Sequence, residues 1–506
     1  MDNKRVVLIG FHNQKALGIR YLANALKAAG YEPYLVFFME FNSIIPKKPT
    51  AREIELLKEL LMQIDPCFVG LSVMSSLYLE TVEMTNKAVR EALSGVSVGW
   101  GGVYPTLEPE RCAGYCDYVM RGEGEQTIVE LLDAITRGGD TLGIMNLAYK
   151  RDGEIVMNDI RPLQQDIDTY GFPEIGGDNN YYIHLDRIDL GDPQLMSYSY
   201  EMSASRGCPF TCSYCCSISL SRLYRGKGKY VRFRSVNSVM QELNEAKKKI
   251  KKLRLIHFWD EIFSDEEGWI EEFSRRYKAE IGLPFRIWGH PLRINERIIK
   301  NLVGAGLHQI VVGIQSGSER VRKEVFHRPE SREQIIESSR VLSGCGVPKV
   351  VYDFMLGHSF ESRDELIETF DLCMELEPPF ALSIHGLNYL PGTDIVKMAL
   401  DEGYYSREEM DSMMYGSIQS QYDEYWGPNA YHKISADNVW MALIFLTQFK
   451  KARPKLNALA QMAREGSDYD AVFALKRKME SKKRMRGYIE KAALMLKLPS
   501  ALISSD

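Results

Sequence analysis

The chain has 506 residues, of which 45% are hydrophobic and 26% are charged, and its formal net charge is −5. This length exceeds what one hydrophobic core supports, so we expect about two to four domains. The charge excludes a chain-wide basic field of the kind that binds nucleic acid. The apolar runs at the start and at 439–446 are too short for a signal peptide or a membrane span, which predicts a cytoplasmic protein without a span.

The first 140 residues alternate between strand and helix patterns. Strands are expected at 5–11, 33–38, 68–74, 96–100 and 118–120, and helices at 16–30, 52–64, 78–93 and 126–135. This alternation predicts a doubly wound, Rossmann-like parallel sheet, which binds ligands at the carboxyl ends of its strands. Small residues gather at those ends, namely Ser72, Ser75, Gly101, Gly102, Gly122 and Gly124.

Residues 141–198 form the predicted connection to a second domain. The segment 146–158 indicates a hairpin that turns at Asp152-Gly153. Residues 159–198 are rich in Asp, Gly and Tyr and are interpreted as an irregular linker.

A second alternating series occupies residues 199–400. Strands are expected at 199–205, 254–259, 284–289, 308–314, 348–356 and 380–389, with helices between them, for example at 235–250 and 362–376. Six such units predict an open, partial (β/α)6 barrel with its site at the carboxyl ends of the strands. Residues 401–506 change to helical patterns with basic stretches, which predicts a mainly helical C-terminal domain.

Four of the nine cysteines lie within RGCPFTCSYCCSIS, residues 206–219. Cys208, Cys212 and Cys215 directly follow the first predicted barrel strand. Three thiolates cannot close a structural zinc site, which takes four ligands, but they can hold a [4Fe-4S] cluster and leave one iron open. Tyr214 can pack on a nucleobase, and Cys216 is interpreted as a bystander. Zinc binding or buried free thiols are the alternatives.

This cysteine spacing, with an aromatic residue before the last cysteine and a partial barrel after it, resembles the radical S-adenosylmethionine (SAM) superfamily. The resemblance implies that the open iron binds the amino and carboxylate groups of SAM. One electron from the cluster would then release a 5′-deoxyadenosyl radical. The segment WDEIFSDE, 259–266, resembles the loop that binds the SAM amine, with Asp260 and Glu261 as acceptors. An acidic helix start is the alternative for these two residues.

Two further segments match the superfamily by position. VGIQSGSERV, 312–321, places Gln315 and Ser316 near the ribose or carboxylate of SAM. YDFMLGHSFES, 352–362, resembles the fifth-strand motif beside adenine, with Met355 as the expected contact, although Gly-His-Ser-Phe-Glu replaces the usual Gly-Phe-Pro-Gly-Glu. Aromatic and histidine side chains near strand ends form a predicted substrate pocket, although each alone is typical of barrel packing: Trp259, Trp288, His290, Tyr352, His385 and Tyr389.

The N-terminal domain carries a second resemblance. The segments LSVMSS (71–76), GWGGVYPTLEPE (99–110) and MRGEGEQT (120–127) resemble the cobalamin-binding domain of cobalamin-dependent radical SAM enzymes. The resemblance implies that Ser72 and Ser75 hydrogen-bond the cofactor's nucleotide tail, that Gly101 and Gly102 line it, and that Glu123 reaches a side-chain amide. A structural or nucleotide-binding domain is the alternative.

One departure from the cobalamin-binding pattern concerns histidine. Domains that ligate cobalt from below carry Asp-x-His-x-x-Gly after the first strand. Here Gly10 replaces the aspartate, and five residues separate His12 from Gly18. We therefore expect base-off cobalamin with no histidine ligand to cobalt, and at most a contact between His12 and the corrin.

The resemblance covers residues 1 to about 395 and implies a methyltransferase of the class B type. One SAM would methylate cob(I)alamin, and a second would give the radical that abstracts hydrogen from an unactivated carbon, which then takes the methyl group. The expected partners are a small-molecule, peptide or protein substrate and an external electron donor of the flavodoxin or ferredoxin type. A cobalamin-dependent radical cyclase or ring-remodelling enzyme, or a non-catalytic cobalamin and iron–sulfur sensor, are the alternatives.

Two basic segments, 224–235 and 247–254, raise the question of RNA binding. The first can instead seal the cluster loop, and the second is the basic end of a helix. The chain shows neither of the additional domains that RNA methylthiotransferases carry, so nucleic acid is not an expected partner.

Overall fold

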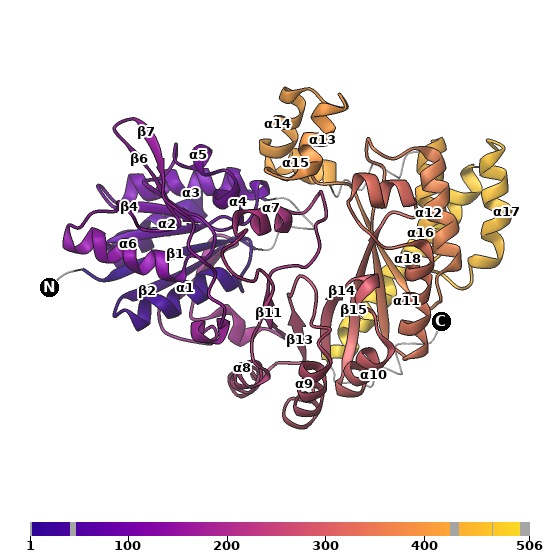
Figure 1. Ribbon diagram of the computed structural model, residues 1–506, viewed down its shortest axis with the longest axis horizontal. Coiled ribbons are helices and arrows are strands. Elements are labelled where there is room, and N and C mark those ends of the chain that lie inside the picture. The colour runs from indigo at the N-terminus through magenta and orange to yellow at the C-terminus, as the bar shows by residue number, and fades with distance from the viewer. Residues whose placement is uncertain (1–2, 41–46, 426–434, 468, 496–506) are drawn as a thin grey trace.

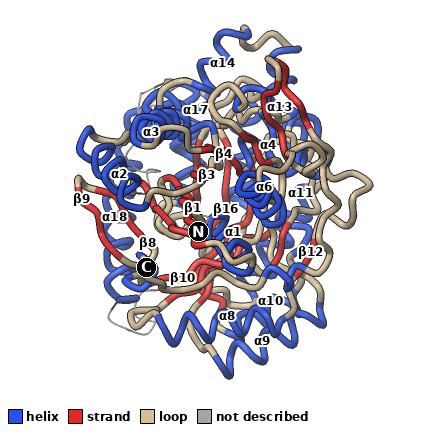
Figure 2. The backbone as a smooth tube through the Cα atoms, turned by 90° about the vertical axis from the view of Figure 1, so that its left-hand side faces the viewer, coloured by secondary structure: helices blue, strands red, loops and turns tan. Residues whose placement is uncertain are grey.

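The computed structural model describes residues 3–40, 47–425, 435–467 and 469–495. Two units of strands and helices lie side by side, the first from the N-terminal part of the chain and the second from the later part (Figure 1). In the perpendicular view, helices surround the strands (Figure 2). No described helix is both long enough and apolar enough to cross a bilayer.

The first unit is built on a nine-stranded sheet with the order β7-β6-β5-β4-β3-β1-β2-β8-β9. Its five predicted strands are all parallel: β1 (Arg5–Phe11), β2 (Glu32–Phe38), β3 (Phe68–Ser72), β4 (Ser97–Gly101) and β5 (Tyr118–Met120). Alternate residues of β1 face opposite layers, so Val6 and Leu8 pack in one apolar core and Val7 and Ile9 in another.

Helices cover both faces of this sheet. One layer contains α1 (Leu17–Ala28) and α6 (Glu125–Arg137), and the other contains α2 (Ala51–Ile64) and α3 (Leu79–Ala92). Three short helices follow strands β3 and β4, namely η1 (Ser76–Tyr78), α4 (Val103–Leu107) and α5 (Pro109–Cys112). The doubly wound architecture is therefore confirmed.

Hairpins extend both edges of the sheet. The predicted hairpin is confirmed as β6 (Leu147–Arg151) and β7 (Glu154–Met157), joined at Asp152-Gly153. The prediction of an irregular segment at 159–198 is wrong in part, because β8 (Asn180–His184) and β9 (Arg187–Leu190) add to the edge beside β2. These strands are short and largely polar, and backbone pairing with β2 rather than an apolar pattern defines them. Two 3-10 turns flank them, η2 (Ile167–Tyr170) and η3 (Pro193–Met196).

The second unit contains six parallel strands in chain order, which confirms the partial barrel. They are β10 (Ser199–Met202), β13 (Leu255–Phe258), β14 (Phe285–Gly289), β15 (Leu307–Gln315), β16 (Lys349–Met355) and β17 (Ala381–His385). Around them lie α8 (Val236–Lys249), α9 (Glu267–Glu280), α10 (Glu296–Ala305), α11 (Arg332–Gly344) and α12 (Arg363–Glu375). Residues that face these helices are buried, whereas the inner face is half-exposed at Glu201, His257, Arg286, Asp353 and His385.

Smaller elements lie at the carboxyl ends of the barrel strands. A two-stranded pair, β11 (Ser205–Arg206) and β12 (Arg232–Phe233), encloses α7 (Cys216–Leu223). The remaining turns are η4 (Pro291–Arg293) and η5 (Val321–Val325), which is a single turn of π-helix.

The C-terminal region is helical, as predicted. Its elements are α13 (Asp394–Asp401), α14 (Arg407–Tyr415), α15 (Ile418–Tyr425), α16 (Ala436–Leu446), α17 (Arg453–Arg464) and α18 (Tyr469–Met495). Helix α16 shares its apolar core with the barrel, and Trp440 meets Phe370 of α12 at 5.7 Å between ring centroids. Residues 426–434, 468 and 496–506 of the predicted C-terminal domain lie outside the described residues.

Helices α14 and α15 cross from the barrel to the first unit. Tyr415 donates a hydrogen bond to Glu108 (3.3 Å), and the side chain of Gln421 donates to the carbonyl of Ser76 (3.4 Å). Figure 1 shows these helices spanning the upper side of the molecule between the two units. The two units are therefore joined by a second connection besides the one at residues 191–198.

Candidate functional site

A cavity of ≈ 400 Å³ lies between the two units. The first unit supplies the carboxyl ends of β3, β4 and β5 and the start of α1, which is the edge where the sequence predicted a ligand site. The barrel supplies residues 203–207, parts of α7 and residues 230–234, and Glu261. One cavity therefore connects the glycine-rich edge of the first sheet with the residues that lead into the cysteine loop.

Glycines bring the backbone to the wall of this cavity. A Cβ on Gly70 would lie 2.8 Å from a methyl carbon of Leu8, so a larger residue there would require the Leu8 side chain to shift. Gly102 has a φ of +111°, and a Cβ on it would lie 2.6 Å from the carbonyl of Val73. Ser72 and Gly101 line the same wall, as predicted. These backbone groups fit a ligand that carries amides along an elongated arm, such as the nucleotide tail and side chains of cobalamin.

Two predicted cobalamin residues do not line the cavity. Ser75 caps η1, because its hydroxyl accepts a hydrogen bond from the amide of Leu77 (3.2 Å). His12 is fully buried, with Nδ1 3.1 Å from the carbonyl of Glu40 and Nε2 3.0 Å from the hydroxyl of Thr81. Burial lowers the pKa of His12 to about 4. Both ring nitrogens of His12 are thus engaged inside the first unit.

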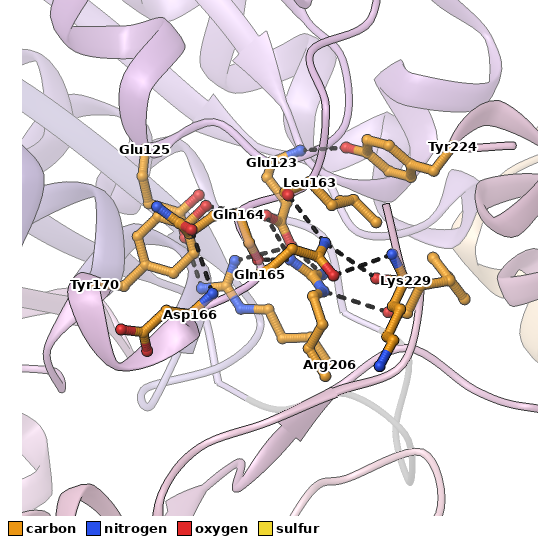
Figure 3. A network of polar contacts seen from close by, with 12 residues as sticks. Glu123, Glu125, Leu163, Gln164, Gln165, Asp166, Tyr170, Arg206, Tyr224 and Lys229 are labelled. Atoms are coloured by element: carbon orange, nitrogen blue, oxygen red, sulfur yellow. Dashed lines mark hydrogen bonds and ion pairs between the residues drawn. The ribbon is translucent and has the colours of Figure 1, made fainter. Parts of the chain in front are cut away.

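Glu123 lines the cavity, and Arg232 of the barrel and Tyr170 of η2 hold its carboxylate. Arg232 donates two hydrogen bonds to it, at 2.6 Å and 3.1 Å, and Tyr170 donates a third at 3.0 Å (Figure 3). Burial alone would raise the pKa of Glu123, but the hydrogen bonds from Arg232 and the charges of Arg206 and Arg232 place it below its ordinary value. The expectation that Glu123 binds a cofactor amide stays a prediction, and a bound cofactor would share this carboxylate with Arg232 and Tyr170.

Arg206 extends the same network to the cysteine loop. Its guanidinium lies 2.6 Å from Glu125 and 3.3 Å from Glu123, and it stands over the rings of Tyr21 and Tyr170. The hydroxyl of Tyr224 accepts a hydrogen bond from the amide of Glu123 (2.8 Å). The loop between β5 and α6 is therefore fixed to residues just before the first cysteine and just after α7.

The three predicted cluster cysteines lie on the loop between β11 and α7. Backbone contacts to two other barrel loops hold it in place, because Ser213 donates to the carbonyl of Phe326 (3.1 Å) and Ile395 donates to the carbonyl of Ser213 (3.0 Å). Cys216 begins α7, which agrees with its interpretation as a residue outside the ligand set.

The cysteine thiols are chemically suited to a cluster. Burial raises the pKa of Cys208 to about 12 and that of Cys215 to about 11, and the negative charges of neighbouring thiolates and Glu261 act in the same direction. In the described part of the chain, no three His, Cys, Asp or Glu residues lie close enough to hold one metal ion. Cysteine thiolates are the ligands of iron–sulfur clusters, and binding to iron favours the thiolate form, so the donor set fits such a cluster.

Arg328 is a site residue that the sequence analysis missed. It is buried and donates to Tyr214 Oη (3.1 Å) and to the carbonyl of Gly313 (2.6 Å), with Cys212 Sγ at 3.8 Å. Glu330 balances its charge at 2.6 Å. Hydrogen-bond donors to cluster sulfurs tune such centres, so Arg328 is placed to do so. Its only sequence signal is an isolated arginine after η5, in a loop without a recognised motif.

The two predicted acceptors of the SAM amine have different roles. Asp260 is buried and accepts hydrogen bonds from the amide of Ala204 (3.0 Å) and from the hydroxyl of Ser205, so it holds the turn before the cysteine loop. Burial raises the pKa of Asp260 to about 6 even though these bonds oppose the shift. Glu261 lines the cavity with its residue exposed to the open space, and partial desolvation by the surrounding walls together with the charge of Asp260 raises its pKa to about 7. Of this pair, Glu261 faces the space where a ligand binds.

Gln315, Ser316 and Met355 gather at the carboxyl ends of β15 and β16. Gln315 has a φ of +72°, and its side-chain oxygen is buried without a hydrogen-bond partner among the described residues. Ser316 is fully buried, and Met355 packs in one apolar cluster with Tyr214. A buried acceptor that lacks a donor favours a polar ligand, so this corner fits the ribose hydroxyls or ammonium group of SAM.

The predicted substrate residues divide between two faces of the barrel. Trp288 and His385 lie on the half-exposed inner face, where His385 meets Asp353 at 3.0 Å and Trp288 lies 5.9 Å from Trp259 between ring centroids. Tyr352 is a correction, because it faces outward and packs against Phe380 at 5.4 Å. Strand alternation places it there, one residue from the inward Asp353.

His290 and Tyr389 are further corrections to the predicted pocket. His290 is buried and stacks on Phe210 of the cysteine loop, with 3.7 Å between ring centroids. Tyr389 is buried and meets Tyr405 edge to face at 5.5 Å. His290 supports the cysteine loop, and Tyr389 contributes to the apolar cluster that contains Met355.

Two family models match the chain. The model described as the radical SAM superfamily matches residues 202–373, and the model of the B12 binding domain matches residues 12–132. The first range contains the cysteine loop and strands β13 to β16, and the second contains the glycine-rich wall of the cavity.

Characterised and uncharacterised relatives match at moderate identity. An uncharacterized methyltransferase of Pyrococcus horikoshii is 28% identical over 349 residues, which cover 68% of this chain and 71% of that protein. The anaerobic magnesium-protoporphyrin IX monomethyl ester cyclase of Cereibacter sphaeroides is 26% identical and covers 72% and 57%. The cytidylyl-2-hydroxyethylphosphonate methyltransferase of Streptomyces wedmorensis is 22% identical and covers 78% and 79%.

Solved structures share the fold. The radical SAM methyltransferase TsrM from Kitasatospora setae, with cobalamin and a [4Fe-4S] cluster bound, has a TM-score of 0.63 at 18% identity and covers 79% of this chain and 78% of that one. The cobalamin-dependent SAM radical enzyme OxsB has a TM-score of 0.62 at 14% identity and covers 97% and 81%.

Proposed function

From the B12-binding and radical SAM domains that make this chain a cobalamin-dependent radical SAM enzyme of the methyltransferase type, we propose that it methylates an unactivated carbon. The substrate would be a small biosynthetic molecule or a peptide side chain. The observation that carries this proposal is the single cavity that joins the glycine-rich edge of the first sheet to Arg206, Gly207 and Glu261 of the barrel. A methyl donor and a radical source bound at its two ends would face one reactant.

An unactivated carbon has no acidic proton and is not a nucleophile, so it cannot take a methyl group by acid–base chemistry. Cofactors bound here would supply a deoxyadenosyl radical to activate this carbon and a methyl group to transfer to it. Cys208, Cys212 and Cys215 would hold the cluster, and Arg328 donates toward Cys212. Gln315, Ser316, Glu261 and Met355 would orient SAM. The contacts of Arg206 and Arg232 with Glu123 keep the two walls of the cavity at a fixed separation.

We further propose that cobalamin binds base-off with no histidine on its lower face. His12 supports this, because both of its ring nitrogens already have partners in Glu40 and Thr81. The buried position of His12 and its pKa of about 4 keep the ring neutral and in place.

A second candidate is a cobalamin-dependent radical cyclase. The relative from Cereibacter sphaeroides is such a cyclase by name, and this chain spans 57% of its length. The methyltransferase remains the first candidate, because relatives named as methyltransferases are matched over 71% and 79% of their lengths.

An anaerobic assay with SAM and a strong reductant distinguishes the candidates. The methyltransferase forms both 5′-deoxyadenosine and S-adenosylhomocysteine, the cyclase forms only the first, and a non-catalytic sensor forms neither. Cys208→Ala should abolish cluster absorbance and deoxyadenosine formation while cobalamin binding persists. Cys216→Ala is the matched control and should keep all three. Deoxyadenosine formation by the Cys208 variant would refute the assignment.

A further inference from the structure

The chain around the cysteine loop is strongly basic. Residues 202–241 contain no aspartate or glutamate, although the whole chain has a net charge of −5. The cations of this stretch are Arg206, Arg222, Arg225, Lys227, Lys229, Arg232 and Arg234. A local excess of this kind needs partners, and the structure identifies them for four of the seven.

The four paired arginines are used inside the protein. Arg206 and Arg232 pair with Glu123, and Arg234 pairs with the buried Glu242. Arg222 binds Asp394 with two hydrogen bonds. These residues have structural partners and are not available to another molecule.

Arg225, Lys227 and Lys229 form the remaining group, which we call the basic loop. Within the described part of the chain, none of the three forms an ion pair. Arg225 and Lys229 are exposed and Lys227 is half-exposed. In Figure 3 the side chain of Lys229 extends away from the buried network. Three unpaired cations on one surface loop attract an anionic surface.

The basic loop covers the cysteine loop. The two segments are joined by the pairing of Arg206 with Arg232, and a Cβ on Gly207 would lie 2.9 Å from the carbonyl carbon of Tyr230. Tyr230 Oη is 3.3 Å from the hydroxyl of Ser217 in α7. Gly207 directly precedes Cys208, and Ser217 lies two positions after Cys215, so Tyr230 contacts both ends of the cysteine loop. Tyr230 is thus the layer between the basic loop and the cysteines.

We propose that the basic loop is the docking surface for an acidic one-electron carrier protein, such as a flavodoxin, that reduces the cluster. This inference rests on the proposed function, because radical formation consumes one electron in each cycle. The carrier is oxidised by one electron, the cluster is reduced by one electron, and no bond or proton is exchanged in this step. The positive charge of the basic loop favours a negatively charged partner. Because Tyr230 lies between the basic loop and the cysteine loop, a carrier docked there would pass its electron to the cluster at this place.

The test is a charge reversal with a matched control. The variant Arg225→Glu/Lys227→Glu/Lys229→Glu is compared with Lys248→Glu/Lys251→Glu/Lys252→Glu, which makes the same charge change at the amino-terminal end of the barrel strands. The dissociation constant for a purified acidic flavodoxin is measured at low and at physiological salt. Stopped-flow absorbance then gives the rate of cluster reduction by that flavodoxin and by photoreduced deazariboflavin, a small neutral reductant.

At low salt we expect the basic-loop variant to bind flavodoxin at least about 10-fold more weakly and to be reduced by it about 10- to 100-fold more slowly. Its salt dependence should be nearly flat, because salt screens the attraction that has been removed. Reduction by deazariboflavin should be unchanged, and the control variant should remain within about twofold of the wild type. The single variant Lys229→Glu should show a smaller effect of the same kind.

Three results would overturn the docking assignment. These are unchanged flavodoxin binding in the triple variant, an equal loss in the control variant, and, when retention of a labelled RNA is measured beside them, a loss of RNA retention with no change in the rate of cluster reduction. The last result would assign the loop to nucleic acid. Failure of the proposed function is a separate outcome, in which deazariboflavin reduces the cluster but no deoxyadenosine forms with SAM.

Discussion

Gly122 lies at a close approach between the two units, so replacing it tests the interdomain contact directly. Its φ is +73°, and a Cβ there would lie 2.9 Å from Cζ of Tyr224 and closer still to the hydroxyl. Gly122→Ala therefore adds left-handed strain of about 1 kcal/mol. It also displaces Tyr224, which forfeits the hydrogen bond from the amide of Glu123, worth about 1 kcal/mol. Overpacking at the contact costs a further ~1–3 kcal/mol.

Gly138→Ala is the matched control, because Gly138 has a φ of +66° and no atom within 4 Å of the added Cβ. The two variants share the backbone strain, so their difference reports the contact with Tyr224, at least about 2 kcal/mol. This difference corresponds to roughly 30-fold faster amide exchange of residues 118–130 and 216–232 in the Gly122 variant.

Hydrogen exchange with mass spectrometry measures this local opening without assuming two-state unfolding of a long chain. The double variant Gly122→Ala/Tyr224→Phe should recover part of the protection, because the hydroxyl that meets the new methyl group is gone. Equal exchange in the Gly122 and Gly138 variants would show that the interface does not depend on this approach.

Three other predictions concern Arg206, His358 and His12. Arg206→Met should weaken the interface between the units by about 2–3 kcal/mol, because it leaves Glu125 without its cation. Calorimetry should then show separate unfolding of the two units. A single unshifted transition would contradict this prediction. Burial lowers the pKa of His358 to about 4 in the folded protein, whereas the same imidazole has a pKa of about 6.5 in the unfolded chain. As the pH drops from about 6.5 to 4, the unfolded chain therefore binds a proton that the folded protein does not, and the free energy of unfolding falls. Between pH 7 and pH 5, His358→Phe should lose less free energy of unfolding than the wild type, by on the order of 2 kcal/mol, as measured by urea titration. An identical loss in the two proteins would contradict this prediction. In His12→Ala, the Co(II) electron paramagnetic resonance spectrum of bound cobalamin should match the wild type, and a nitrogen splitting present only in the wild type would show histidine ligation.

Elements with strong apolar patterns could be predicted from the sequence. The run RVVLIGF became β1 over the expected residues, and each of the six expected barrel strands is present. The strands β8 and β9 could not be predicted in this way, because NYYIH and RIDL present little apolar surface and owe their place to the edge of β2. Edge pairing is a tertiary effect that local pattern does not record.

The candidate site shows the same division between local and long-range information. The cysteine spacing is local, so the loop and its proposed ligand set could be predicted from the sequence. The partners of Glu123 are distant in sequence, since Arg232 lies 109 positions away, and the pairing that holds its carboxylate is visible only in the folded chain. Tyr352 and Asp353 differ by one position on β16, and that position decides which of them faces outward.

The second connection between the two units bears on how a bulky corrin enters. After β17 the chain passes through α14 and α15, which contact the first unit, and α16 then packs on the barrel, so the two units are joined covalently at residues 191–198 and non-covalently by this strap. The contacts of α15 with the first unit include Gln421 with Ser76 and Ile418 with Glu80, which are polar and separable without unfolding a core. Release of this strap would let the two units separate further, and so admit a bulky ligand, while the barrel and the nine-stranded sheet stay intact.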